Sequence, residues 1–161
     1  MINSQVNENF YFYIMDTISI NILLADDDND DCLFFKEALE ELPLSTKLTT
    51  VSDGYQLMQV LNKTEVLPHV LFLDLNMPRK NGYECLSEIQ FNPSLNKLPI
   101  IILSTSFDKD SVNQLHDYGA HYYIRKPGEF AELKNVIYKA LSTIENNNFV
   151  KPAKDKFVLS L

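Results

Sequence analysis

Short apolar runs alternate along the chain with longer segments in which apolar residues recur every three or four positions. The apolar runs do not alternate with polar residues, which is typical of strands in a parallel sheet that is covered on both faces. We therefore expect strands at residues 18–25, 47–51, 70–74, 99–104 and 121–125. The amphipathic segments predict helices at residues 31–42, 55–61, 81–90, 109–118 and 129–146.

The regular alternation of these segments predicts five βα units. Right-handed crossovers between parallel strands would then place helices on both faces of the sheet, in a doubly wound α/β sandwich. The strand at 47–51 is the least apolar and suits an edge. Residues 18–146 would form one domain, with an N-terminal extension at 1–17 and a tail at 147–161 that is too short for an output domain.

Helical spacing also predicts which side chains face the sheet. In the first helix the apolar set includes Leu33 and Phe34. In the helix at 81–90 it consists of Tyr83, Leu86 and Ile89. We expect these side chains to be buried in the core.

The net charge is −8 and the isoelectric point is about 4.8, which argues against binding to nucleic acid or to an acidic membrane surface. No apolar run approaches the roughly 18 residues of a membrane span. The first basic residue, Lys36, comes too late for a secretory signal. The spacing of Cys32 and Cys85 suggests neither a zinc site nor a disulfide framework. We expect a cytoplasmic protein with reduced cysteines.

Polar residues stand at the carboxyl ends of four predicted strands. Asp26-Asp27-Asp28 follows the first strand, Asp74 ends the third, Ser104 ends the fourth and Lys126 follows the fifth. In folds of this class these strand ends share one edge of the sheet, where ligands bind. The side chains should therefore lie close together.

Such a set suits phosphoryl transfer. Neighbouring carboxylates repel one another, and a divalent cation such as Mg²⁺, which prefers oxygen ligands, relieves that repulsion. A carboxylate beside Mg²⁺ can act as the nucleophile, while the oxygens of the transferred group need a cation, an ammonium and a hydroxyl donor. The residues that supply these groups are Asp26, Asp27, Asp74, Ser104 and Lys126.

The same residues resemble the motif of response-regulator receiver domains in two-component signalling. The similarity lies within residues 21–144 and consists of Asp26-Asp27, Asp74-Leu75-Asn76-Met77-Pro78 with Gly82, Ser104, and Lys126-Pro127. The segment 99–106 is most similar to small single-domain receivers that work with bacterial phytochrome-type kinases. The resemblance implies a CheY-like, flavodoxin-like fold with a five-stranded sheet in the order 2-1-3-4-5.

Position in this motif implies a role for each acid. Asp74 would be the phosphoacceptor and would also contact the Mg²⁺ ion. Asp27 would be a direct Mg²⁺ ligand and Asp26 would act through water. The backbone carbonyl of Asn76, two residues after Asp74, would complete the protein ligands.

The remaining motif residues are expected to sense the phosphoryl group. Lys126 would neutralise its oxygens, and Ser104 would donate a hydrogen bond to it. Tyr123 would be the switch aromatic that swings inward as Ser104 moves. A cis peptide bond between Lys126 and Pro127 is expected to aim the lysine.

The resemblance implies a sensor histidine kinase or a His-phosphotransfer protein as the phosphodonor. Readout would be phosphorylation-dependent binding to a protein target, and a homodimer is an open alternative to a monomer. Beyond self-phosphorylation and self-dephosphorylation, no enzyme activity is expected.

Several alternatives fit parts of the pattern. Asp26, Asp28, Asp30 and Glu37 occupy positions 1, 3, 5 and 12 of an EF-hand loop. However, a strand precedes them, and Asp31 replaces the glycine that such a loop needs. The calcium-site hypothesis is therefore disfavoured.

An aspartyl phosphatase would need an acid two residues after Asp74 to protonate the leaving group, and Asn76 cannot do so. A flavin- or nucleotide-binding module would need a phosphate loop after the first strand, where the acids at 26–31 would repel phosphate. A receiver-like domain that only docks stays an alternative.

Overall fold

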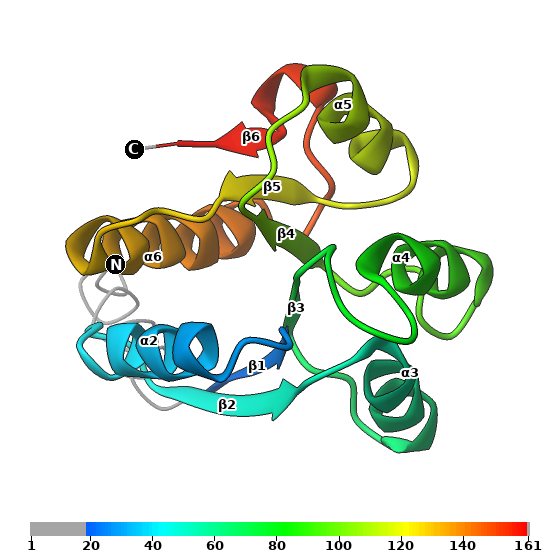
Figure 1. Cartoon of the computed structure of the whole chain (residues 1–161), viewed down its shortest axis with the longest axis horizontal. Helices are drawn as coiled ribbons and strands as arrows, with labels where there is room; N and C mark the ends of the chain where they lie inside the picture. The colour runs from blue at the N-terminus through cyan, green and yellow to red at the C-terminus, as the bar shows by residue number, and fades with distance from the viewer. Residues whose placement is uncertain (1–18, 161) are drawn as a thin grey trace, which may run out of the picture.

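The computed structural model describes residues 19–160 (Figure 1). The strands are β1 (Ile20–Ala25), β2 (Thr46–Val51), β3 (Val70–Leu73), β4 (Ile100–Ser104), β5 (Tyr122–Arg125) and β6 (Val158–Leu159). The helices are α2 (Asn29–Glu40), α3 (Gly54–Lys63), α4 (Gly82–Phe91), α5 (Lys109–Asp117) and α6 (Phe130–Asn146), with a 3₁₀ turn, η1 (Lys154–Lys156). None of these helices is long and apolar enough to cross a membrane. The extension predicted at 1–17 lies outside the described residues.

The strands of the described chain form a parallel sheet in the order β2-β1-β3-β4-β5-β6. The first five follow the predicted order, and the half-polar β2 forms one edge as expected. Helices α2 and α6 cover one face, whereas α3, α4 and α5 cover the other (Figure 1). The doubly wound α/β fold is therefore confirmed.

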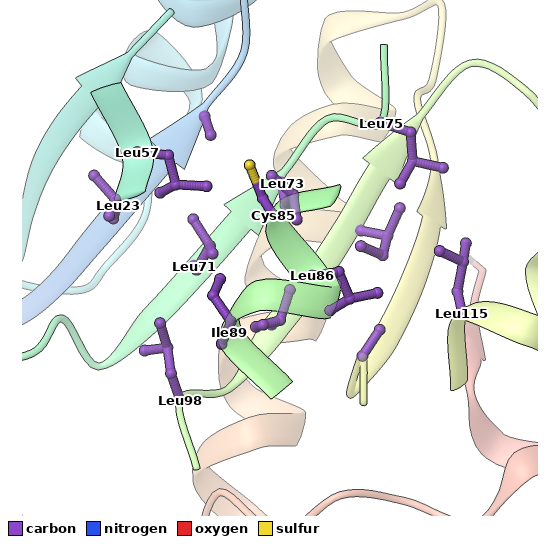
Figure 2. Packing of buried hydrophobic residues seen from close by; sticks show 14 of the residues in the cluster. Leu23, Leu57, Leu71, Leu73, Leu75, Cys85, Leu86, Ile89, Leu98 and Leu115 are labelled. Atoms are coloured by element: carbon purple, nitrogen blue, oxygen red, sulfur yellow. The ribbon is translucent and has the colours of Figure 1, made fainter. Parts of the chain in front are cut away.

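Each face of the sheet has its own apolar core, because successive side chains of a strand point to opposite faces. Leu71 and Leu73 of β3 pack on one face with Leu86 of α4 (Figure 2). Phe72, between them, packs on the other face against Phe35 of α2, with ring centroids 4.9 Å apart. Burial on both faces explains why the strands lack alternating polar residues.

Two predicted helix faces are partly wrong. In α2, Leu33 and Phe34 are 50% and 49% exposed, and Phe35 is the buried aromatic residue. Three consecutive apolar residues permit more than one helical face, and the edge-to-face contact with β3 selects Phe35. In α4, Tyr83 is 40% exposed, and Cys85 is buried instead. Cys85 fits there because it faces α3, where its thiol donates to the carbonyl of Gly54 at 3.6 Å.

The C-terminal tail contributes a sixth strand, so the predicted five-stranded sheet is one strand short. Tyr123 and Ile124 of β5 pair with Val158 and Leu159 of β6. Phe157 precedes this strand and is fully buried. Because β6 has only two residues, it shows no periodic pattern that could be found in the sequence.

Candidate functional site

The carboxyl ends of β1 and β3 lie side by side where the sheet order reverses direction. Ala25 is in register with Leu73, and the backbone N–H of Asp74 donates to the carbonyl of Ala25 at 2.9 Å. Asp26 and Asp74 therefore begin neighbouring loops. Folds of this class bind ligands at such a switch point.

Close packing of α4 fixes the loop after Asp74. The N–H of Gly82 donates to the carbonyl of Leu75 at 3.0 Å. A Cβ atom added at Gly82 would overlap the carbonyl oxygen of Asp74. A capping box between Asn81 and Glu84 starts the helix at this point. The glycine of the motif is therefore required by the close approach of two backbones.

The Asp74 carboxylate is largely buried and accepts a hydrogen bond from the backbone. Its side chain is 8% exposed, and its Oδ1 accepts a hydrogen bond of 3.2 Å from the N–H of Asn76. Burial raises the pKa of Asp74 to about 6, an effect that the charge of Lys126 opposes and the charge of Asp26 reinforces. A carboxylate in this setting gains more from a nearby cation than one that water already stabilises.

Three carboxylates converge at the strand ends. One oxygen each from Asp26, Asp27 and Asp74 lie within 4.8 Å of one another. Asp26 and Asp74 are buried and Asp27 is exposed, so the group has an open side. Burial raises the pKa of Asp26, whose Oδ1 accepts from the N–H of Asp28 at 3.0 Å. This donor set fits a hard divalent cation such as Mg²⁺.

Lys126 reaches from the end of β5 to the same carboxylates. Its Nζ donates to Asp26 at 2.7 Å and to Asp31 at 2.8 Å, and it lies 3.5 Å from Oδ2 of Asp74. Burial alone would lower the pKa of Lys126, but the hydrogen bonds to Asp26 and Asp31 outweigh it and raise the pKa above its ordinary value. The site thus contains a permanent ammonium beside Asp74.

Sequence reasoning did not assign roles to two acids of the loop after β1. Asp28 is the N-cap of α2, and its Oδ1 accepts from the N–H groups of Asp30 and Asp31 at 2.9 and 3.2 Å. Asp31 lies in the first turn of that helix and binds Lys126. An aspartate just before an amphipathic segment is a cap signal, which could have identified Asp28. Nothing local in the sequence indicates the partner of Asp31, which is 95 residues away.

Ser104 and Tyr123 lie on the adjacent strands β4 and β5, and both contact Ser106. The Oγ of Ser104 accepts from the N–H of Ser106 at 3.3 Å, and the Tyr123 hydroxyl donates to the carbonyl of Ser106. Both side chains are fully buried, and the Tyr123 ring centroid lies 6.1 Å from that of Phe107. The loop after β4 therefore links the two predicted switch residues.

The Lys126–Pro127 bond is trans, as are the other peptide bonds of residues 19–160. The predicted cis bond is wrong. Lys126 reaches its carboxylates with the trans isomer, which is the lower-energy form of most bonds that precede proline.

Comparison with known proteins agrees with this site. The family model described as the response regulator receiver domain matches residues 22–138. Response regulator Rcp1 from Synechocystis sp. is 30% identical over 121 residues, which cover 72% of this chain and 82% of Rcp1. The chain belongs to the response regulator receiver family and is a phosphoacceptor domain of two-component signalling.

Solved structures support the same assignment. The phosphorylated cyanobacterial phytochrome response regulator RcpA matches with a TM-score of 0.73 and 29% identity, over 84% of this chain and all of that one (100%). The Mn²⁺-bound form of Rcp1 matches with a TM-score of 0.67 and 29% identity, over 83% of this chain and 99% of that one. The resemblance inferred from the motif is confirmed at the level of family and fold.

Proposed function

We propose that the chain accepts a phosphoryl group on Asp74 from a histidine kinase or a His-phosphotransfer protein, and then signals by binding another protein. Residues 18–146 would form the receiver unit, and the tail packs onto it through Phe157 and strand β6. The observation that carries this proposal is the convergence of Asp26, Asp27 and Asp74 with the ammonium of Lys126, which lies 3.5 Å from Asp74.

In the proposed reaction an ionised carboxylate oxygen of Asp74 attacks phosphorus and forms an acyl phosphate, while the bond to the donor atom breaks. With a pKa of about 6, Asp74 is mostly ionised at neutral pH even without a cation. Lys126 neutralises charge on the phosphoryl oxygens. Mg²⁺, held by Asp26, Asp27, Asp74 and the carbonyl of Asn76, would supply the further positive charge that these oxygens need.

The contacts of Ser106 support a switch. A hydrogen bond from the Ser104 hydroxyl to a phosphoryl oxygen would change the contact that Ser104 makes with the N–H of Ser106. Because the Tyr123 hydroxyl binds the carbonyl of the same residue, a shift of this loop alters the packing of Tyr123. A local electrostatic event would thus bias the surface around β5.

The surface beside the site suits a protein donor. A cavity of about 440 Å³ between α2 and α6 is lined by Asp26, Lys126 and apolar side chains that include Phe34 and Phe130. Phe34 is half-exposed there. An apolar surface next to a reactive carboxylate gives a kinase or phosphotransfer protein a place to dock while it presents its phosphohistidine.

We further propose that the protein is no enzyme beyond its own phosphorylation and slow self-dephosphorylation. Asn76 lies beside Asp74 and has no acidic proton for a leaving group.

Both cysteines are free thiols, which fits the cytoplasmic location expected from the sequence.

Intact mass spectrometry after incubation with acetyl phosphate tests the proposal. Wild type should gain one phosphoryl group only when Mg²⁺ is present, and Asp74→Asn should gain none. Asp110→Asn, which removes an equal charge from the exposed first turn of α5, is the matched control and should behave as wild type. A gain that persists in Asp74→Asn would assign the phosphoacceptor to another residue, and no gain in any variant would favour a domain that only docks.

A further inference from the structure

Lys126 divides its hydrogen bonds between acids that belong to different elements. Asp26 follows β1, whereas Asp31 lies in the first turn of α2. We propose that Asp31 is a positioning residue that competes with the phosphoryl group for Lys126 and so limits how tightly the site holds that group. This role presupposes the phosphoacceptor function proposed for Asp74.

The contacts of the Lys126 ammonium carry this proposal. A lysine ammonium has three N–H donors, and two of those on Lys126 point to Asp26 and Asp31 at nearly equal distances, 2.7 and 2.8 Å. The contact with Asp74 is longer, at 3.5 Å. In this arrangement Lys126 is held mainly by the two acids that do not accept the phosphoryl group.

Asp31 has a fixed backbone and a half-exposed side chain. The Asp28 side chain binds the N–H of Asp31 at 3.2 Å and fixes its backbone. The Asp31 side chain is 41% exposed, compared with 2% for Asp26, so its ion pair with Lys126 borders on solvent. A half-exposed ion pair contributes modestly, and its loss should change affinities by a small factor.

The two acids would respond differently to a loaded site. Asp26 belongs to the group of carboxylates that can hold a cation, so a bound Mg²⁺ would compensate its charge. The cation that Asp31 contacts within the described residues is Lys126 itself. When phosphoryl oxygens appear on Asp74, the third N–H of Lys126 can donate to one of them. A second donated bond, or a closer approach of the ammonium to Asp74, would come at the expense of the bond to Asp31, and that cost opposes retention of the phosphoryl group.

The test compares Asp31→Asn with Asp30→Asn, which removes the same charge from the same helical turn, where Asp30 is exposed. The first readout is the affinity for beryllofluoride, a phosphoryl mimic, in saturating Mg²⁺ by ¹⁹F NMR. The second is the initial rate of phosphorylation by acetyl phosphate, followed by intact mass. Asp31→Asn should bind beryllofluoride about two- to fivefold more tightly than wild type and react faster by a similar factor, while Asp30→Asn should match wild type.

Further outcomes separate this role from others. In a Lys126→Ala background the effect of Asp31→Asn on beryllofluoride affinity should disappear, because Asp31 acts through the lysine. If Asp30→Asn gained as much beryllofluoride affinity as Asp31→Asn, the effect would be one of general charge. If the affinity of Asp31→Asn were unchanged or lower, Asp31 would support the structure of the site instead of competing for Lys126. Either result would overturn the inference. If the proposed function is wrong, wild type itself gains no phosphoryl group from acetyl phosphate. Beryllofluoride binding requires no transfer, so the effect of Asp31→Asn on it can still be measured in that case.

Discussion

Tyr123 and Phe157 are joined through their backbones, since the N–H of Tyr123 donates to the carbonyl oxygen of Phe157 at 2.9 Å. Through its hydroxyl, Tyr123 also binds Ser106 in the loop after β4. The Phe157 side chain is buried in the same cluster as Leu115 of α5, and its ring makes an edge-to-face contact with His116 at a centroid distance of 5.2 Å. The tail is thus part of the core on this side of the sheet.

Replacement of Phe157 should therefore destabilise the whole domain. Phe157→Ala removes a fully buried ring, and we expect the free energy of unfolding to fall by about 3–4 kcal/mol in urea titrations followed by circular dichroism. Val158→Ala in the adjacent strand is the control, since Val158 is 43% exposed and should lose less than about 1 kcal/mol. Equal, small losses in both variants would show that the tail is not anchored by Phe157.

The acid that starts α2 should act as a cap. Asp28→Ala leaves the N–H groups of Asp30 and Asp31 without their acceptor, and we expect a loss of about 1 kcal/mol in thermal or urea unfolding. Asp28→Asn keeps a side-chain oxygen in place and should retain most of the stability. If Asn cost as much as Ala, the negative charge near the helix N-terminus, and not the hydrogen bonds, would be the source of the stabilisation.

The sequence predicted those features of the fold that depend on local pattern. Strand β3 is an uninterrupted apolar run, β4 and β5 are apolar or aromatic up to their last residue, and β1 is interrupted only by Asn21, because both faces of the sheet are covered. Since parallel strands share one edge at their carboxyl ends, the positions of Asp26, Asp74 and Lys126 were enough to predict their convergence.

What the sequence could not predict depends on contacts between distant segments. The choice of Phe35 over Phe34 in α2 is made by a ring in β3. The partner of Asp31 is 95 residues away, and β6 is defined by its pairing with β5 instead of by its own two residues. None of these contacts leaves a periodic signal in the chain.

A buried histidine should make stability depend on pH. His121 accepts a hydrogen bond at Nδ1 from the N–H of Ile100 at 3.3 Å, and burial, assisted by the charge of Lys151, lowers the pKa of His121 from 6.5 to about 4. The folded state therefore resists protonation while the unfolded chain accepts a proton below pH 6.5. The contribution of His121 to stability is complete above pH 6.5 and is lost as the pH falls toward 4, by about 2–3 kcal/mol.

The variant His121→Asn isolates this contribution, because the amide oxygen can still accept from Ile100 but carries no proton in this range. Urea unfolding of both proteins at several pH values between 7.5 and 4 measures the difference. Wild type should lose stability more steeply than His121→Asn below pH 6.5. Parallel pH profiles would show that His121 titrates normally in the folded protein.

Mg²⁺ should stabilise the fold, because the folded chain assembles Asp26, Asp27 and Asp74 into one group and the unfolded chain does not. At a free Mg²⁺ concentration tenfold above the dissociation constant, we expect the free energy of unfolding to rise by about 1.4 kcal/mol, and EDTA should reverse the gain. Asp27→Asn removes the exposed ligand without opening the core, so it should lose most of this Mg²⁺ effect. Asp30→Asn removes the same charge from outside the group and should keep it. Retention of the full Mg²⁺ effect in Asp27→Asn would place the cation elsewhere on the protein and would remove the main support for Mg²⁺-dependent chemistry at Asp74.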